Sequence, residues 1–195
     1  MSDPTEAVQS DEVALSVPFW AVVALGATGT AVGVLLVPLT WAIPAYGLWG
    51  AILGVVTAID LRELRIPNRI NLVAAVVTFP LLALATLANI DGSSFMRAVA
   101  GAFAGFGVYL ALNLISPRSL GMGDVKLAFT IGAHLAFIGW PVWFQGIFFA
   151  FLSMSVVGLI LMVAKLAGRK TAVPFGPFMV FGAFSALGIA TIQAI

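Results

Sequence analysis

The stretch VWFQGIFFAFLSMSVVGLILMVAKL, residues 142–166, carries no charge until Lys165 near its end. A helix rises 1.5 Å per residue, so about 20 apolar residues cross the hydrocarbon core of a bilayer. In lipid the backbone must satisfy its own hydrogen bonds, which a helix does within one segment. The stretch therefore predicts a membrane-spanning helix.

The rest of the chain repeats this pattern. Of its 195 residues 62% are hydrophobic and 9% are charged, whereas soluble domains carry about 25% charged residues. No stretch alternates between apolar and polar residues as a barrel strand would. We expect an all-α polytopic membrane protein with about seven transmembrane helices, the other six at residues 19–39, 41–59, 70–88, 95–115, 125–139 and 175–195.

The beginning of the chain differs from the rest. Residues 1–16 are polar and acidic, and the first basic residue is Arg62, so they lack the basic region that opens a signal peptide. We expect a disordered tail over 1–16 and one transmembrane domain over 17–195. The chain has no cysteine, one histidine and a net charge of +1. These counts exclude a cysteine or histidine metal cluster, and they predict neither a cofactor nor a nucleic-acid partner.

Basic residues predict the orientation in the membrane, because they gather in cytoplasmic connections. Seven helices bring three of the connections to one side, and the opposite connections hold only Arg97. We therefore expect the N-terminus in the cytoplasm and the C-terminus outside. The basic residues on the predicted cytoplasmic side are Arg62, Arg65, Arg69, Arg118, Lys126, Lys165, Arg169 and Lys170.

Four carboxylates lie outside the N-terminal tail. Asp91 reads as part of a solvated turn, and Glu63 as an ion partner of nearby arginines. Asp60 ends one apolar run and Asp124 opens another, both at the predicted cytoplasmic edge. An ionisable group at membrane depth is a functional candidate. The alternatives are that Asp124 only caps its helix and that Asp60 only pairs with Arg62 or Arg65.

Two facing carboxylates suit peptide hydrolysis. Both cannot ionise at close range, so they share one proton. The ionised group then takes a proton from water while the protonated group polarises the amide, and no metal is needed. Gly121 and Gly123 flank Met122 just before Asp124, and glycine allows a substrate strand to approach the backbone closely.

Three motifs carry a family resemblance. GMGDVKL (121–127), IDLRELRIPNRINL (59–72) and VPFGPFM (173–179) resemble, in this order, signatures of the type IV prepilin and preflagellin peptidases, which are membrane aspartic proteases. The resemblance spans roughly residues 49–180. It implies that Asp60 and Asp124 are the catalytic pair. It also implies that a prokaryotic plasma-membrane enzyme cuts the basic leader from pilin, pseudopilin or flagellin precursors at the cytoplasmic face.

The resemblance also implies a short form of the family. Bifunctional members carry a cytoplasmic domain with paired CxxC motifs that is linked to N-methylation, whereas this chain has no cysteine. We therefore expect peptidase activity alone. The helix at 19–39 lies outside the six-helix core of short members.

Other residues of the three motifs are candidates for binding substrate or supporting the site. Pro67 is expected to end helical structure and Asn68 to cap the next helix. Lys126 either tunes Asp124 or marks the inner interface. The histidine of the chain, His134, is expected to be a packed polar contact. The supporting candidates are Gly121, Gly123, Lys126, Pro67, Asn68, Pro174, Gly176 and Pro177.

Three other functions remain open at this stage. The two aspartates would serve a transporter as an ion or proton site, although the chain shows no transporter repeat. A scaffold protein would keep the fold and tolerate Asp→Asn at both positions. A presenilin-like GxGD protease would pair GxGD with a tyrosine–aspartate motif, whereas Ile59 precedes Asp60 here.

Overall fold

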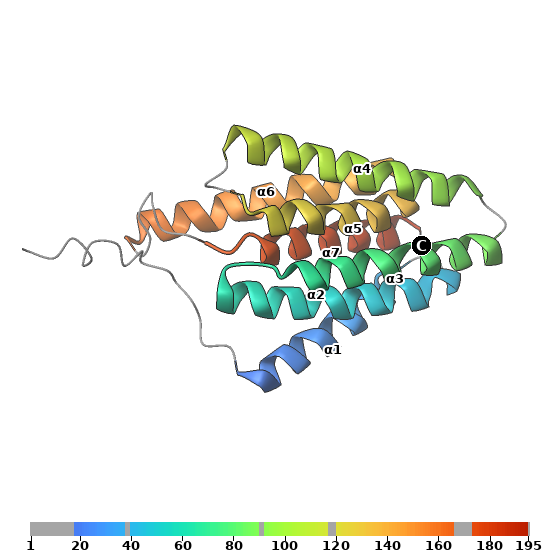
Figure 1. Ribbon diagram of the computed structural model, residues 1–195, viewed down its shortest axis with the longest axis horizontal. Helices are drawn as coiled ribbons and strands as arrows, with labels where there is room; N and C mark the ends of the chain where they lie inside the picture. Colours follow the sequence, from blue (N-terminus) through green and yellow to red (C-terminus); the bar gives the residue numbers. More distant parts are fainter. Residues whose placement is uncertain (1–17, 38–39, 90–91, 117–119, 166–172, 195) are drawn as a thin grey trace, which may run out of the picture.

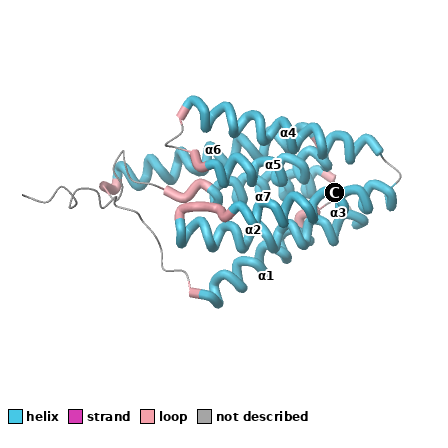
Figure 2. Tube along the Cα trace, in the orientation of Figure 1, coloured by secondary structure: helices cyan, strands magenta, loops and turns pink. Residues whose placement is uncertain are grey.

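The computed structural model describes residues 18–37, 40–89, 92–116, 120–165 and 173–194. These residues form helices and connections, and no strand occurs among them (Figure 2). The tail predicted over 1–16 lies outside the described residues, as does Asp91. The elements are α1 (Phe19–Leu35), a short 3-10 turn (Thr40–Ala42), α2 (Ile43–Glu63), α3 (Asn68–Asn89), α4 (Gly92–Ile115), α5 (Met122–Ile138), α6 (Trp140–Val163) and α7 (Gly176–Gln193).

Each of the seven predicted spans corresponds to one helix, and the differences lie at the ends. Helix α2 continues a full turn beyond the predicted end at residue 59, to Glu63. Helix α5 begins at Met122 instead of residue 125. A span predicted from hydropathy ends at the first polar residue, whereas the helix itself continues until its backbone leaves the helical conformation. In α2 this occurs at Leu64, whose φ of 52° is left-handed.

The architecture is that of a multi-pass helical membrane protein. Among the described residues five helices, α2, α3, α4, α6 and α7, are long and apolar enough to cross a membrane, and α1 contains a shorter apolar helix. Helix α6 is the most hydropathic of the five, and only 11% of its apolar window is buried within the protein. Most of the surface of α6 therefore faces outward from the bundle.

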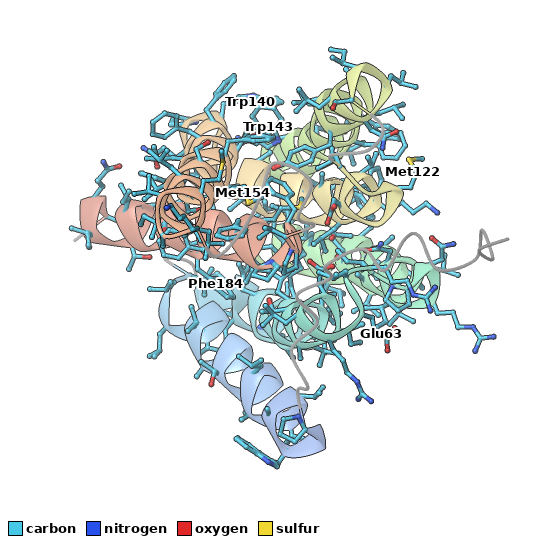
Figure 3. All side chains as sticks on the ribbon, turned by 90° about the vertical axis from the view of Figure 1, so that its left-hand side faces the viewer. Glu63, Met122, Trp140, Trp143, Met154 and Phe184 are labelled. Carbon is cyan, nitrogen blue, oxygen red and sulfur yellow. The ribbon has the colours of Figure 1, made fainter. Side chains whose placement is uncertain are left out.

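Helix α5 occupies the interior of the bundle. It packs against α3, α4, α6 and α7, and Figure 3 shows it among these helices in a view along the bundle. Near the C-terminal end of α5, His134 stacks on Trp49 of α2, with ring centroids 4.2 Å apart. Most α5 side chains are consequently buried, including Asp124.

The helix ends that flank the three predicted basic connections lie at one end of the bundle. The ends of α2, α4 and α6 and the beginnings of α3, α5 and α7 all lie at the left-hand end in Figure 1, whereas Arg118, Arg169 and Lys170 lie outside the described residues. At the opposite end Arg97 of α4 donates hydrogen bonds to the carbonyls of Ala136 and Phe137, where α5 ends. The single basic residue of that end therefore serves as a cap for the central helix.

Candidate active site

Asp60 begins the last turn of α2 and points into the protein. Its exposed fraction is 3%. One carboxylate oxygen, Oδ2, accepts a hydrogen bond of 2.8 Å from the backbone N–H of Gly176, the first residue of α7. The first N–H groups of a helix have no partner within the helix, so Asp60 satisfies one of them. Within the described residues the side-chain hydrogen bond of Asp60 is thus with α7, and not with Arg62 or Arg65.

Glycine at position 176 permits this approach. A Cβ atom placed there would lie 2.7 Å from Asp60 Oδ2, a separation that real Cβ atoms do not adopt. Pro177 follows within the first turn of α7, where a missing N–H is harmless. Pro174 is half-buried in the short connection before the helix. Of the three residues in this motif, Gly176 is the one that the structure brings into contact with Asp60.

Asp124 lies at the third position of α5, with an exposed fraction of 7%. The N-cap of the helix is Gly121, so the alternative in which Asp124 is itself the N-cap is wrong. Its Oδ2 instead accepts the N–H of Gly121 at 3.1 Å, as the third residue of a capping box does. The helix begins earlier than hydropathy predicts because Gly121 already has the extended backbone of an N-cap.

The two aspartates come from different helices. Both side chains are buried, and they lie close enough for the charge of Asp60 to act on Asp124. Within the described residues the second oxygen of Asp124, Oδ1, has no hydrogen-bond partner although it is buried. A buried polar atom without a partner needs an explanation, and a carboxylate oxygen in this position is able to receive water or substrate.

Tyr109 is a residue of this site that the sequence analysis missed. It lies on α4 with an exposed fraction of 3%, and it is within electrostatic range of Asp124. Its ring packs against Phe151 and Phe175, which links the α4 side of the site to the segment before α7. The sequence did contain a signal for it: the chain has two tyrosines, and Tyr109 places a hydroxyl within an otherwise apolar span.

The connection between α2 and α3 braces the beginning of α5. Ile66 packs on Gly123, where an added Cβ would lie 2.9 Å from the Cβ of Ile66. Asn71 of α3 donates its side-chain N–H to the carbonyl of Gly123 at 3.0 Å. The sequence analysis did not single out Asn71; its signal was a second asparagine three residues after Asn68. The Ile-Pro-Asn segment and the GxGD segment therefore form one contact region.

Lys126 and Asn68 contact each other across this region. The Lys126 ammonium donates to Asn68 Oδ1 at 2.6 Å, so Lys126 binds a residue of α3 and not Asp124. The side chain of Asn68 was predicted to cap α3, but its Oδ1 accepts the hydrogen bond from Lys126. The carbonyl of Pro67 instead accepts the first backbone bonds of α3, from Ile70 and Asn71.

His134 lies far from the aspartates. Ten residues separate it from Asp124 on α5, which is about 15 Å along a helix. Its ring is fully buried against Trp49, and its backbone carbonyl accepts the Tyr46 hydroxyl at 2.6 Å. It is the packed polar contact that the sequence analysis expected. Within the described ranges no three His, Cys, Asp or Glu side chains gather as metal ligands would.

The sequence comparisons agree on one family. The model of the type IV leader peptidase family matches residues 47–163, a range that includes both aspartates and ends before α7. Proteins named prepilin leader peptidase/N-methyltransferase from Burkholderia pseudomallei strains 1026b and K96243 are 32% identical over 160 residues, which covers 77% of this chain and 47% of each relative. The protein of the same name from Aeromonas hydrophila is 29% identical over 143 residues, or 70% of this chain and 46% of the relative.

The chain thus spans about half the length of the curated relatives that it matches. No solved structure matches it. The family model covers more than half of the chain and includes the α2–α3 and α4–α5 segments, where the two aspartates and the motif contacts lie. On this evidence the chain belongs to the type IV leader peptidase family.

Proposed function

We propose that this chain is an aspartic endopeptidase that removes the basic leader from prepilin-like precursors at the cytoplasmic face of the membrane. The observation that carries the proposal is the pair Asp60 and Asp124. These two buried carboxylates come from segments distant in the sequence, and they lie close enough for the charge of Asp60 to act on Asp124. Each carboxylate accepts a hydrogen bond from a glycine N–H. Membership of the leader peptidase family and the names of the relatives support the substrate class.

The pair supplies an acid and a base. Two carboxylates at close range share one proton, because both cannot ionise together. The ionised member takes a proton from a water molecule, and the hydroxide oxygen forms a bond to the carbonyl carbon of the scissile amide. The other member donates its proton to the carbonyl oxygen. When the tetrahedral intermediate collapses, the C–N bond breaks and the leaving amine takes up a proton from the pair.

The glycine N–H groups orient this chemistry. Each one holds an Oδ2 atom, at 2.8 Å for Asp60 and 3.1 Å for Asp124. The Oδ1 atom of Asp124 has no partner in the described part of the chain and is therefore the oxygen that we assign to the water or the scissile amide. Placing reacting groups in this way supplies much of the rate of an enzyme.

The position of the site in the bundle supports a cytoplasmic substrate junction. Asp60 precedes the basic α2–α3 connection, and Asp124 follows the α4–α5 connection. Basic connections remain on the cytoplasmic side of a membrane. A precursor whose apolar helix lies in the bilayer would present its leader at this level. A prokaryotic plasma membrane is the corresponding location.

A cleavage assay with two conservative variants tests the proposal. The purified protein in detergent is given a precursor with a basic leader, and product mass is followed for wild type, Asp60→Asn and Asp124→Asn. Asparagine keeps the size and loses the titratable oxygen, so we expect each variant to be slower by at least about 10²-fold. Variants that cut at the wild-type rate would show that the pair is not catalytic. If wild type leaves a panel of precursors uncut, the peptidase proposal itself fails.

A further inference from the structure

A groove separates α3, α4 and α5 near the end that carries the active site. Its volume is about 480 Å³, within the range of ligand sites. It opens toward the outside of the bundle, since Leu72 and Phe103 on its rim are 65% and 64% exposed. Three phenylalanines and two α3 side chains make its walls apolar, and two asparagines and a lysine lie at one end. The lining residues are Asn68, Asn71, Leu72, Ala75, Phe103, Phe106, Lys126 and Phe129.

The polar end holds a buried acceptor that lacks a donor. Asn71 is 5% exposed, and its Nδ2 donates to the Gly123 carbonyl. A carbonyl only accepts, so this bond fixes the orientation of the amide and leaves Oδ1 on the other side. Among the described residues nothing donates to this oxygen. A buried acceptor without a donor is destabilising unless water or a ligand satisfies it.

Beside this acceptor lies a strong donor. Lys126 lines the groove, and its ammonium has three protons, of which Asn68 Oδ1 takes one at 2.6 Å. The polar end therefore combines an acceptor and a cationic donor. A polypeptide backbone, with N–H and C=O groups in sequence, satisfies both of them.

We propose that the groove docks the apolar segment that directly follows the scissile bond of the precursor. This inference rests on the proposed peptidase function. The first N–H groups of the precursor's apolar helix have no partner of their own and match Asn71 Oδ1. The phenylalanine and leucine walls match its apolar side chains. The basic leader is repelled by Lys126 and lies on the other side of the scissile bond, away from the groove.

The connection to the active site is short. The bond between Asn71 and the carbonyl of Gly123 places the polar end one residue before Asp124. If the apolar helix of the precursor begins in the groove, the precursor residues just before that helix lie at the start of α5. A phospholipid is the other candidate occupant. Its phosphate and ester oxygens are acceptors that suit Lys126, but a donor for Asn71 Oδ1 exists only in headgroups that carry an amine or a hydroxyl. A peptide backbone always supplies both N–H and C=O groups, so the peptide is the occupant that we assign to the groove.

Filling the groove tests this inference. Ala75→Phe places a ring against the walls, and cleavage is measured on two substrates: a full precursor, and a soluble peptide that ends a few residues after the scissile bond. We expect the KM of the full precursor to rise at least about tenfold through loss of binding to the apolar segment, and kcat/KM of the short peptide to stay at the wild-type value. Val76→Phe is the matched control, because Val76 is exposed and lies on the same helix outside the groove.

The outcomes separate the two proposals. If wild type cuts neither substrate, the peptidase proposal fails and this inference fails with it. If wild type cuts both and Ala75→Phe cuts the full precursor with an unchanged KM, only the groove assignment is overturned. If Ala75→Phe does not fold, Phe103→Ala decides, since it removes an exposed wall; a raised KM for the full precursor alone supports docking, and an unchanged KM overturns it.

A photo-crosslinking amino acid at position 103, in the Asp124→Asn background, identifies the occupant. We expect adducts with the residues just after the scissile bond of the precursor. Adducts with the basic leader, or with phospholipid only, would overturn the assignment.

Discussion

The two aspartates have the same kind of partner at very different sequence distances. Asp124 accepts the N–H of Gly121, three residues earlier in the chain. Asp60 accepts the N–H of Gly176, which lies 116 residues later on another helix. The Asp124 contact forms whenever the first turn of α5 forms. The Asp60 contact forms only when α7 is docked on α2.

This difference assigns different tasks to the two glycines. Gly121 supplies an N–H from an extended N-cap with φ −75°, a conformation that any residue adopts. Gly176 supplies an N–H and also leaves room, because a Cβ there would meet the Asp60 carboxylate. The local contact therefore depends on the donor alone, and the long-range contact depends on the absence of a side chain as well.

Gly176→Ala is expected to have the largest effect. The added Cβ lies 2.7 Å from Asp60 Oδ2 in the present geometry, so the carboxylate must move away from the α7 N–H and shift relative to Asp124. Misplacement of a catalytic group by about 1 Å costs on the order of 10²-fold in rate. We expect a loss of kcat of this size, measured by cleavage of a prepilin-like precursor.

Gly107→Ala is the matched control for this substitution. Gly107 also lies in a helix, and an added Cβ there meets nothing within 4 Å. Its kcat should equal that of wild type. A Gly176→Ala protein that remains fully active would mean that Asp60 does not need its present position, and the long-range contact would lose its functional meaning.

Gly121→Pro tests the local contact and should have a smaller effect. Proline fits the observed φ of −75° but has no N–H, so Asp124 loses its donor while φ at position 121 is kept. Loss of one hydrogen bond to a charged group predicts a decrease in kcat of about tenfold.

Gly121→Ala is the companion variant because it keeps the N–H. Its Cβ would lie 3.3 Å from Asp124 Oδ2, which a shift of the side chain relieves, so we expect activity within about threefold of wild type. Equal losses in the proline and alanine variants would show that space, and not the donor, matters at position 121. The contrast with Gly176 would then disappear.

Hydropathy predicts the number and the approximate positions of the helices, but it does not predict where each helix ends. The apolar runs predict seven helices because lipid requires long apolar segments with a satisfied backbone. The beginning of α5 at Met122 and the end of α2 at Glu63 depend on polar residues that hydropathy counts as non-helical. Both errors fall at the aspartates, since a carboxylate at the membrane edge interrupts an apolar run without ending the helix.

The candidate site was predictable to a similar degree. Counting carboxylates selects Asp60 and Asp124, and the motif resemblance adds the segment around Gly176. The long-range partners of these segments required the fold. Asn71 reads from the sequence as one polar residue near the beginning of a helix, and only the docking of α3 on α5 shows that it holds the Gly123 carbonyl. Tyr109 likewise needs the packing of α4 on α5 before it lies near Asp124.

Glu63→Gln is expected to have the smallest effect, and it tests how far the site extends along α2. Glu63 Oε2 lies 3.8 Å from Arg65 Nε, and both side chains are exposed. Such surface pairs contribute less than about 1 kcal/mol, so the thermal unfolding midpoint and kcat/KM should match those of wild type. A decrease in kcat/KM at an unchanged unfolding midpoint would show that the charge of Glu63 influences the reaction and not the stability of the fold. Glu63 follows Asp60 by three residues on α2, a spacing that places side chains on one helix face, and its charge would then belong to the electrostatics of the aspartate pair.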